Sequence, residues 1–579
     1  MSLSGIRTIA YSSLSASQYQ ISVASSNVAN ADTTGYTKKS ATQTSVNYGS
    51  SGSGVAIASV SSNVSKYLLS DLAEATTTLG AATVTNDFAD RLQSLFGSIS
   101  SDSSSGDSLS SGIADLESAL SSLASTPESD TLKAQVVDAL DTVASQLRET
   151  SSSIQSLRAD ADGQIEDGVQ AANDALNAIA ELNTQIASAQ ARGESTSALE
   201  DQRNTALQTL SEQMNVSYYV NSDNQMRVYA STGTTLVDSK AHELSYSSAT
   251  LVTADTVFDA ITVDGNDVTG AITSGKIGAL IEQRDETLPA AQDELDELAS
   301  GLIEALNAVS NSGSSIPAPT TLIGPVIVSA SDTLSATGTA RIAVTDSSGV
   351  LVSYQDLDLS SYSTVGDLVD AIDSIDGLSA SINASGQLTI SSDSSANGVS
   401  IGDIDDSIGS SGEGLSNYFG LNDLLTGTNA SDISVRKDIL ADSSLMPTAS
   451  LSSDSALAVG DAALTEGDST IAQALGDALA GDYSFAAAGG LGSTKSSFAD
   501  YAGDIISTAA SSATSASSAL TTKETAKQTL DDSFSSATGV NLDEETALIS
   551  ELQQQYSTAA QLLQVVNDMF DALLSAAQS

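Results

Sequence analysis

The residues best suited to catalysis are few and far apart. The chain has 579 residues, one histidine and no cysteine. A Ser-His-Asp triad would need His242, but residues 239–243 predict the turn of a hairpin, which places this histidine at the surface. Disulfides and thiolate metal sites are excluded, and a zinc site lacks the several His or Cys ligands that it needs.

Two other segments resemble ligand-binding loops only in part. Residues 270–276 have the spacing of a phosphate loop, but Ile277 stands where Ser or Thr would hold Mg²⁺. Residues 403–407 begin like a calcium loop, but Ile408 replaces the glycine that an EF-hand requires. A turn before a helix and a solvated acidic loop explain these segments better. We therefore expect no catalytic residues, no cofactor and no metal ligands.

The charge excludes whole classes of partner. Seventy-three acidic and 20 basic residues give a formal charge of −53. Nucleic acid and anionic lipid both demand a basic patch, so we expect neither as a partner. No apolar run reaches the length of a membrane span, and we expect no membrane insertion. The N-terminus lacks a cleavable signal peptide, which fits a cytoplasmic protein or one exported by a route that reads no such signal.

The two ends of the chain share a pattern that the middle lacks. In the first and last thirty or so residues, apolar or small residues recur in alternating steps of three and four, the heptad spacing that forms one stripe along a helix. Neither segment is long or apolar enough to be stable alone. We expect the ends to pair with each other, with other subunits, or both. The expected seam residues are Leu3, Ile6, Leu14, Ile21, Val28, Leu548, Leu552, Leu562, Val566, Met569, Phe570 and Leu573.

Local patterns predict a mainly α chain with inserted β structure. A helix is expected over residues 1–31, an extended segment over 37–46, and Gly/Ser-rich loops at 49–54 and 100–112. Helical periodicity dominates from 109 to 309, with separate helices expected over 132–157, 165–192 and 277–309. A further helix is opened by a capping box at Ser197, and short strands of a hairpin region are expected at 216–246. The period then changes to two over 322–405, apart from a short helix at 364–375. Residues 406–494 have no clear pattern, and helix resumes at 497.

This pattern predicts a nested architecture in three parts. Residues 1–85 with 497–579 form a terminal helical domain of paired, coiled-coil-like helices for polymerisation. Residues 86–315 with about 430–496 form a long-helix domain with small β-hairpins. Residues 316–430 form an inserted, β-rich outer domain with its own small core.

A motif at the end of the first helix resembles a known family. The run Asn-Val-Ala-Asn-Ala-Asp-Thr-Thr-Gly-Tyr-Thr-Lys over residues 27–38 is similar to the N-terminal signature of the flagellar rod, hook and hook-associated proteins. Asp32 replaces the usual Asn and Thr34 the usual Pro, and both still suit a turn. The residues matched to the signature are Asn27, Asn30, Thr33, Gly35 and Tyr36. Asn30, Gly35 and Tyr36 are expected to set the turn out of the inner helix.

Other segments resemble the hook-associated members of this family. They are residues 123–127, 199–203 and 278–289 in the interior, and 539–545 and 569–574 near the C-terminus. The resemblance implies a structural, non-enzymatic, ring-forming subunit at the hook–filament junction that filament assembly needs. It also implies secretion through the flagellar type III apparatus without a cleavable signal. The implied partners are further copies of the chain, hook protein, a second hook-associated protein, and an export chaperone at the C-terminal helix.

Three other functions remain open from the residues alone. One is another axial protein, such as hook protein or a filament-type subunit, although flagellins lack the signature at 30–36. A second is a secreted acidic adhesin or calcium-stabilised surface protein. A third is an enzyme that cleaves the cell wall.

Overall fold

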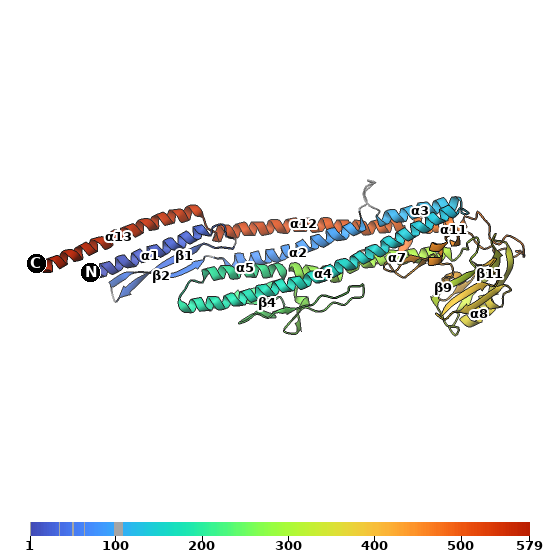
Figure 1. Ribbon diagram of the computed structural model, residues 1–579, viewed down its shortest axis with the longest axis horizontal. Coiled ribbons are helices and arrows are strands. Elements are labelled where there is room, and N and C mark those ends of the chain that lie inside the picture. The colour runs from blue at the N-terminus through green and yellow to red at the C-terminus, as the bar shows by residue number, and fades with distance from the viewer. Residues whose placement is uncertain (1, 34, 49–50, 63, 98–107, 579) are drawn as a thin grey trace. The chain divides into compact units, whose positions relative to one another are not determined.

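The computed structural model describes residues 2–33, 35–48, 51–62, 64–97 and 108–578. Long helices dominate, and small antiparallel sheets occur between them (Figure 1). The predicted fold class is therefore confirmed. Among the described residues, no helix combines the length and apolar character needed to cross a membrane.

The chain folds into two compact units, each built from several stretches of sequence. The first contains Met1–Phe88, Ala159–Arg284 and Thr514–Ser579, and the second contains Ala89–Arg158 and Asp285–Ala513. The three-part division expected from the sequence draws different boundaries and stays a prediction.

Helices of the first unit come from both ends and from the middle of the chain. They are α1 (Leu3–Ala29), the start of α2 (Lys66–Phe96), the end of α4 (Asp130–Arg192), α5 (Ser197–Gln213), α6 (Gly275–Glu282), the end of α12 (Phe498–Thr538) and α13 (Leu542–Gln578). Its strands are β1 (Lys39–Tyr48), β2 (Ser51–Ser62), β3 (Val216–Val220), β4 (Met226–Ala230), β5 (Thr235–Val237), β6 (Leu244–Ser245), β7 (Thr262–Val263) and β8 (Asn266–Asp267).

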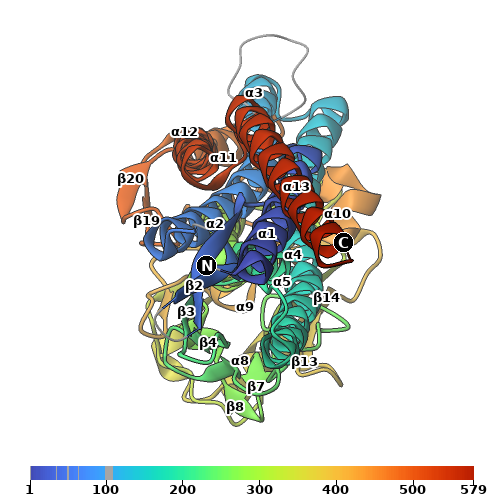
Figure 2. The same ribbon diagram turned by 90° about the vertical axis from the view of Figure 1, so that its left-hand side faces the viewer.

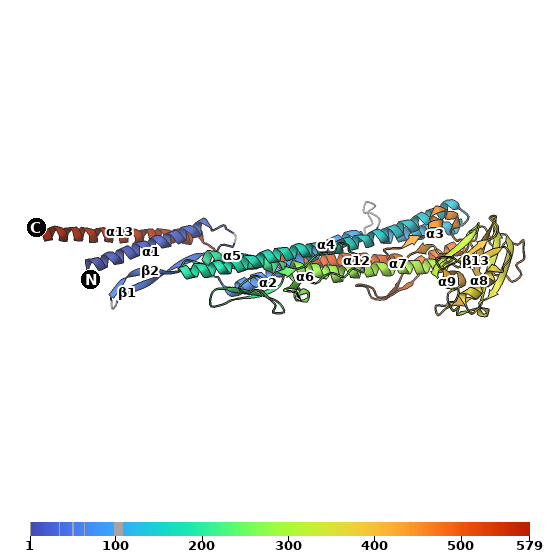
Figure 3. The same ribbon diagram turned by 60° about the horizontal axis from the view of Figure 1, so that its bottom comes forward.

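The terminal helices α1 and α13 lie side by side, as Figures 1 and 2 show. The hairpin β1–β2 packs against α1 (Figure 3). Ser2 caps α1 by accepting a hydrogen bond from the Gly5 backbone N–H at 3.3 Å. The helical ends expected from the heptad pattern are thus paired within one chain.

Three expectations about local structure were wrong. Residues 51–54 are not loop but the start of β2, because β1 supplies a complete antiparallel ladder that accommodates Gly and Ser through bulges. Residues 109–112 of the second expected loop begin α3, and 98–107 lie outside the described residues. Ser197 does not open a capping box, because it is already helical and Thr196 precedes the helix without a side-chain cap.

The long helix α4 joins two helical segments that were predicted separately. Leu157, Ala161 and Ile165 are all buried and four residues apart, so the apolar stripe continues through the polar-looking sequence between the segments. In contrast, the helix expected over 277–309 is interrupted. A π-helical segment, η2 (Gln283–Thr287), separates α6 from α7, in which Pro289 occupies the first turn.

The second unit combines a helical part with a β-rich part. Its helices are α3 (Leu109–Ser125), α7 (Leu288–Ser310), α8 (Val365–Asp373), α9 (Leu415–Phe419), α10 (Lys437–Ala441) and α11 (Thr470–Ala480), with parts of α2, α4 and α12. Its longer strands are β9 (Thr321–Ile327), β11 (Thr339–Asp346), β12 (Leu351–Asp358), β13 (Leu378–Ile382), β14 (Gln387–Ser392) and β15 (Asn397–Asp403). Short strand pairs are β10 (Ala336–Thr337) with β16 (Ser407–Ile408), β17 (Leu425–Thr426) with β18 (Ser434–Val435), and β19 (Tyr483–Phe485) with β20 (Thr494–Ser496).

Two three-stranded antiparallel sheets, ordered β12-β11-β15 and β13-β14-β9, enclose the β-rich core together with α8. Helix α8 begins with a capping box, in which Thr364 and Asp367 each bond the other's backbone N–H. Ile342, Ile401 and Leu368 are fully buried in this core. This β-rich part thus has a hydrophobic core of its own.

We predict that Ile401→Ala destabilises the β-rich part by about 2–5 kcal/mol, since the lost methyl groups leave a cavity in a packed core. Hydrogen exchange of the β11 amides measures this change. The exposed residue on the neighbouring strand supplies the control: Val352→Ala should change the same exchange by less than ~0.5 kcal/mol. Equal effects of the two substitutions would contradict the prediction.

Candidate functional site

The signature residues surround a buried asparagine in the first unit. The Asn27 Oδ1 accepts hydrogen bonds from the Lys39 backbone N–H at 3.0 Å and from the Tyr36 hydroxyl at 2.9 Å. Its Nδ2 donates to the Lys39 carbonyl at 2.9 Å and to the Glu545 carboxylate at 3.0 Å. All four hydrogen-bonding positions of the amide are thereby filled. Asn27 joins α1 to β1 and to α13.

The turn between α1 and β1 is held by local hydrogen bonds and by a glycine. Asn30 donates to the Ser26 carbonyl, and its Oδ1 accepts from the Thr33 hydroxyl at 3.3 Å. Gly35 has φ +77°, and a Cβ there would lie 2.7 Å from Thr205 Oγ1 on α5. Both the backbone conformation and the close approach to α5 therefore require glycine. Thr34 lies outside the described residues.

A buried ion pair fastens this turn to α5. The Asp201 carboxylate accepts from the Thr37 backbone N–H at 3.1 Å, from the Thr37 hydroxyl at 2.6 Å, and from the Lys39 ammonium. The Lys39 Nζ also donates to the Ser197 carbonyl at 3.1 Å and lies 4.9 Å from the centre of the Tyr36 ring. Both charged side chains are buried. A buried pair of this kind is tolerated only because every partner is in place.

The neighbouring lysine fastens the same turn to the C-terminal helices. Lys38 Nζ lies 3.0 Å from Glu545 Oε1 and 3.2 Å from Glu544 Oε2, and its backbone N–H donates to the Thr538 carbonyl at 2.7 Å. The hydrogen bond with Glu545 is the main cause that raises the pKa of Lys38. We call Asn27, Tyr36, Thr37, Lys38, Lys39, Asp201 and Glu545 the signature clasp.

Sequence reasoning identified only part of this clasp. Tyr36 was predicted to act in the turn and Asn27 was matched only to the signature, whereas Asp201 and Glu545 were noticed only inside longer resembling segments. One signal was available for Glu545, because it stands seven residues before Leu552 and so places an acid in the apolar stripe of α13. No comparable signal existed for Asp201, because the partner it meets is more than 160 residues away.

The expected seam residues divide into covered and uncovered sets. On α13 the buried residues Glu545, Leu552, Ala559 and Val566 follow one another at intervals of seven. Leu3, Ile6, Leu14 and Ile21 of α1 and Phe570 of α13 are half-buried, and the Arg7 guanidinium lies over the Phe570 ring. The exposed members are Val28, Leu548, Leu562, Met569 and Leu573. The pair α1–α13 thus covers one heptad position of α13 and leaves another open.

The segments weighed for catalysis are occupied by their own contacts. The two ring nitrogens of His242 face the carboxylates of Asp264 at 2.6 Å and Asp238 at 3.5 Å, and the ring is half-buried rather than at the surface. Lys276 pairs with Glu212 at 2.6 Å. No cluster of three His, Asp or Glu side chains that could hold a metal ion occurs in the described part of the chain.

Four family models match consecutive parts of the chain. The flagella basal body rod protein model matches residues 8–37, the helical domain of the flagellar hook-associated protein FlgK matches 89–318, the flagellin hook IN motif matches 341–394, and the C-terminal model of the basal body rod FlgEFG proteins matches 532–576. Asn27, Asp201 and Glu545 each come from a different one of these matches. The clasp therefore joins the three helical segments.

A solved structure has the same fold. The flagellar hook junction protein FlgK from Burkholderia pseudomallei superposes with a TM-score of 0.50 and 16% sequence identity, over 80% of this chain and 98% of that one. No curated protein sequence matches at a significant level. Since the FlgK helical-domain match covers helices α3 to α7 and rod-protein matches cover both clasped ends, the chain is a flagellar hook-associated protein of the FlgK type.

Proposed function

We propose that this chain is the structural subunit of the junction between the flagellar hook and the filament, that filament assembly needs it, and that it has no catalytic activity. The observation that carries the proposal is the uncovered apolar stripe of α13. Leu548, Leu562 and Met569 share one heptad position, with Gln555 at the turn between Leu548 and Leu562. All three stay exposed, although the neighbouring heptad position is packed on α1. A stripe of this kind is the mark of a surface that another subunit covers.

The proposed partners follow from this surface. Further copies of the chain cover the stripe laterally and close a ring, with hook protein on one side and a second hook-associated protein on the other. An export chaperone covers the same C-terminal helix before secretion. The chain leaves the cell through the flagellar type III apparatus and comes to lie outside the cell at the junction.

The clasp suits a subunit that orders on assembly. Burying apolar surface yields ~25 cal/mol per Å², whereas ordering the backbone costs ~1–2 kcal/mol per residue. Helix α1 buries mainly small residues, such as Ala10, Ala16 and Ala24. The clasp adds directional, charged contacts at the base of α1 and α13, so that the two helices are held in register for a neighbouring subunit.

Deletion of the gene tests the proposed function directly. We expect electron microscopy to show hooks without filaments, and flagellin to accumulate in the medium, because subunits that cannot attach at the junction are lost. Loss of the hooks themselves would place the protein further inward, in the rod or hook. Normal filaments would contradict the proposal.

We predict that Leu562→Asp blocks incorporation while the helical region 109–309 stays folded. The Leu562 side chain is 44% exposed, so a charge there costs the isolated chain little, but it would be buried without a partner once another subunit covers the stripe. Immunolabelling of isolated hooks measures incorporation. The matched control, Gln564→Asp on the same helix, should incorporate normally. Normal labelling of Leu562→Asp would refute the role of the stripe.

We predict that Asp201→Ala weakens the clasp by about 3–5 kcal/mol, because the Lys39 ammonium is then buried without its carboxylate. Hydrogen exchange of the Thr37 and Lys39 amides should become faster by the corresponding factor. Asp223→Ala removes an exposed acid from the nearby β3–β4 turn and should leave these amides unchanged. Unchanged exchange in Asp201→Ala would show that the pair does not hold the turn.

A further inference from the structure

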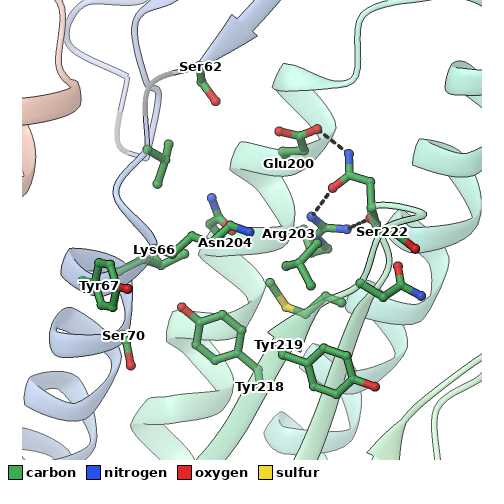
Figure 4. Close-up of a pocket in the computed structure, with 16 residues that line it drawn as sticks. Ser62, Lys66, Tyr67, Ser70, Glu200, Arg203, Asn204, Tyr218, Tyr219 and Ser222 are labelled. Carbon is green, nitrogen blue, oxygen red and sulfur yellow. Dashed lines mark hydrogen bonds between the residues drawn. The ribbon is translucent and has the colours of Figure 1, made fainter.

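A cavity of about 590 Å³ opens in the first unit, beside the clasp but separate from it. It lies where β2 leads into α2, between α5 and the hairpin β3–β4. In Figure 4, Lys66 and Tyr67 stand on one wall, Arg203 on the facing wall, and Tyr218 and Tyr219 on the strand below. Neither the clasp nor the apolar stripe of α13 uses these residues.

The cavity presents donors that lack acceptors. Arg203 is 3% exposed, and its guanidinium donates only to neutral groups, namely Asn183 Oδ1 at 2.9 Å, the Asn224 carbonyl at 2.6 Å and Asn224 Oδ1 at 3.3 Å. The Arg203 Nε and the Tyr218 hydroxyl are buried without a hydrogen-bond partner among the described residues. Buried polar atoms of this kind are rare and call for an explanation.

The charge of the cavity is opposite to that of the chain. Lys66 makes no ion pair within the described part of the chain, and Glu200 is the one carboxylate among the described lining residues. Glu200 already accepts from the Thr196 hydroxyl and from Asn224 Nδ2, both at 2.7 Å. Two cations therefore face one engaged carboxylate, in a chain whose acids outnumber its bases 73 to 20. A second carboxylate is the group that would balance these cations.

The rim of the cavity is aromatic and uncovered. The Tyr67 side chain is 86% exposed and that of Tyr219 is 51% exposed, and the Tyr219 ring stacks on Tyr229 with centroids 6.1 Å apart. Tyrosines beside a buried arginine are the composition of the energetic centre of protein interfaces. Such a rim fits a protein segment that has both apolar and acidic side chains.

The same unit displays a segment with these properties. The loop between β6 and β7 exposes Val257 (93%) and Leu251 (75%), and the exposed acids Asp255 and Asp259 flank Val257. Val257 has the highest exposed fraction of any large apolar side chain in the described residues.

This loop is held in shape rather than left loose. The Ala249 N–H donates to Asp162 at 2.6 Å, and Thr253 and Thr256 close a turn through bonds of 2.7 and 3.1 Å. No described lining residue of the cavity belongs to the loop, so the loop does not fill the cavity of its own chain.

We propose that the 249–259 loop of a second copy of this chain seats in the cavity, with its acids toward Lys66 and Arg203 and with Leu251 and Val257 against Tyr67 and Tyr219. Loop and cavity are different surfaces of one unit, so the contact is head-to-tail, the type that closes rings when the rotation between copies closes. The inference rests on the proposed function in that it requires neighbouring copies side by side.

The absence of cysteine from the chain permits a direct test. One tagged copy carries Tyr67→Cys and another, with a different tag, carries Val257→Cys, and both are expressed in a strain that lacks the native gene. Isolated hook–filament complexes are then oxidised. We expect a disulfide-linked dimer that contains both tags. The pair Tyr67→Cys with Ile327→Cys is the control, since Ile327 is similarly exposed on β9 in the second unit, and it should give no dimer.

If filaments form but no disulfide-linked dimer of the Tyr67→Cys and Val257→Cys copies is found, the proposed contact is wrong. The junction role would still stand, since filaments require a working junction. A charge exchange gives an independent reading if a cysteine variant fails to support filaments. Lys66→Glu should lower incorporation by about fivefold, and adding Asp255→Lys should restore it. A double variant that is exported but incorporates no better than Lys66→Glu would likewise overturn the contact.

Discussion

The buried pair of Lys39 and Asp201 is the interaction on which the arrangement of the first unit depends. An ammonium this far from water is stable only beside a carboxylate with its remaining hydrogen bonds satisfied. The Thr37 hydroxyl and backbone N–H and the Ser197 carbonyl complete that set. Since β1 begins at Lys39, the pair fixes where the hairpin starts relative to α5.

The remaining contacts of the clasp, made by Asn27 and Lys38 with Glu545, connect the same turn to the C-terminal helix α13. Asn27 forms hydrogen bonds with both the backbone of Lys39 and the carboxylate of Glu545. These bonds fix the end of α1 relative to the start of α13. Along α13, two heptad positions then differ in exposure. The position of Glu545, Leu552 and Val566 faces inward, and the position of Leu548 and Leu562 stays exposed. One helix thus serves internal packing and, in our proposal, assembly.

Periodic features could be predicted from the sequence, and pairings between distant residues could not. The terminal helices, most of the long helices and strands β3, β4, β13 and β14 follow from local spacing. The signature predicted the turn at Gly35, because positive φ is a local requirement. Strand β2 was missed because its Gly and Ser residues become a strand only through pairing with β1. Asp201 was missed as a partner of Lys39 for the same reason, since an acid on a helix is ordinarily solvated.

The small number of basic residues also bears on how copies of the chain can assemble. Lys38, Lys39, Arg284 and Arg341 each lie against carboxylates of their own unit, so several of the 20 basic residues act as internal fasteners. The surface that remains is strongly acidic, and two copies repel one another once their surfaces come within about a Debye length, ~8–10 Å at physiological salt. Assembly must then rely on apolar stripes and on the few cations that no internal carboxylate has claimed. Within the described residues, Lys66 makes no ion pair and Arg203 donates its hydrogen bonds only to neutral groups, and both line one cavity. In a chain with this charge balance, a recess in which two bases face a single, already engaged carboxylate is best explained by a partner that brings another.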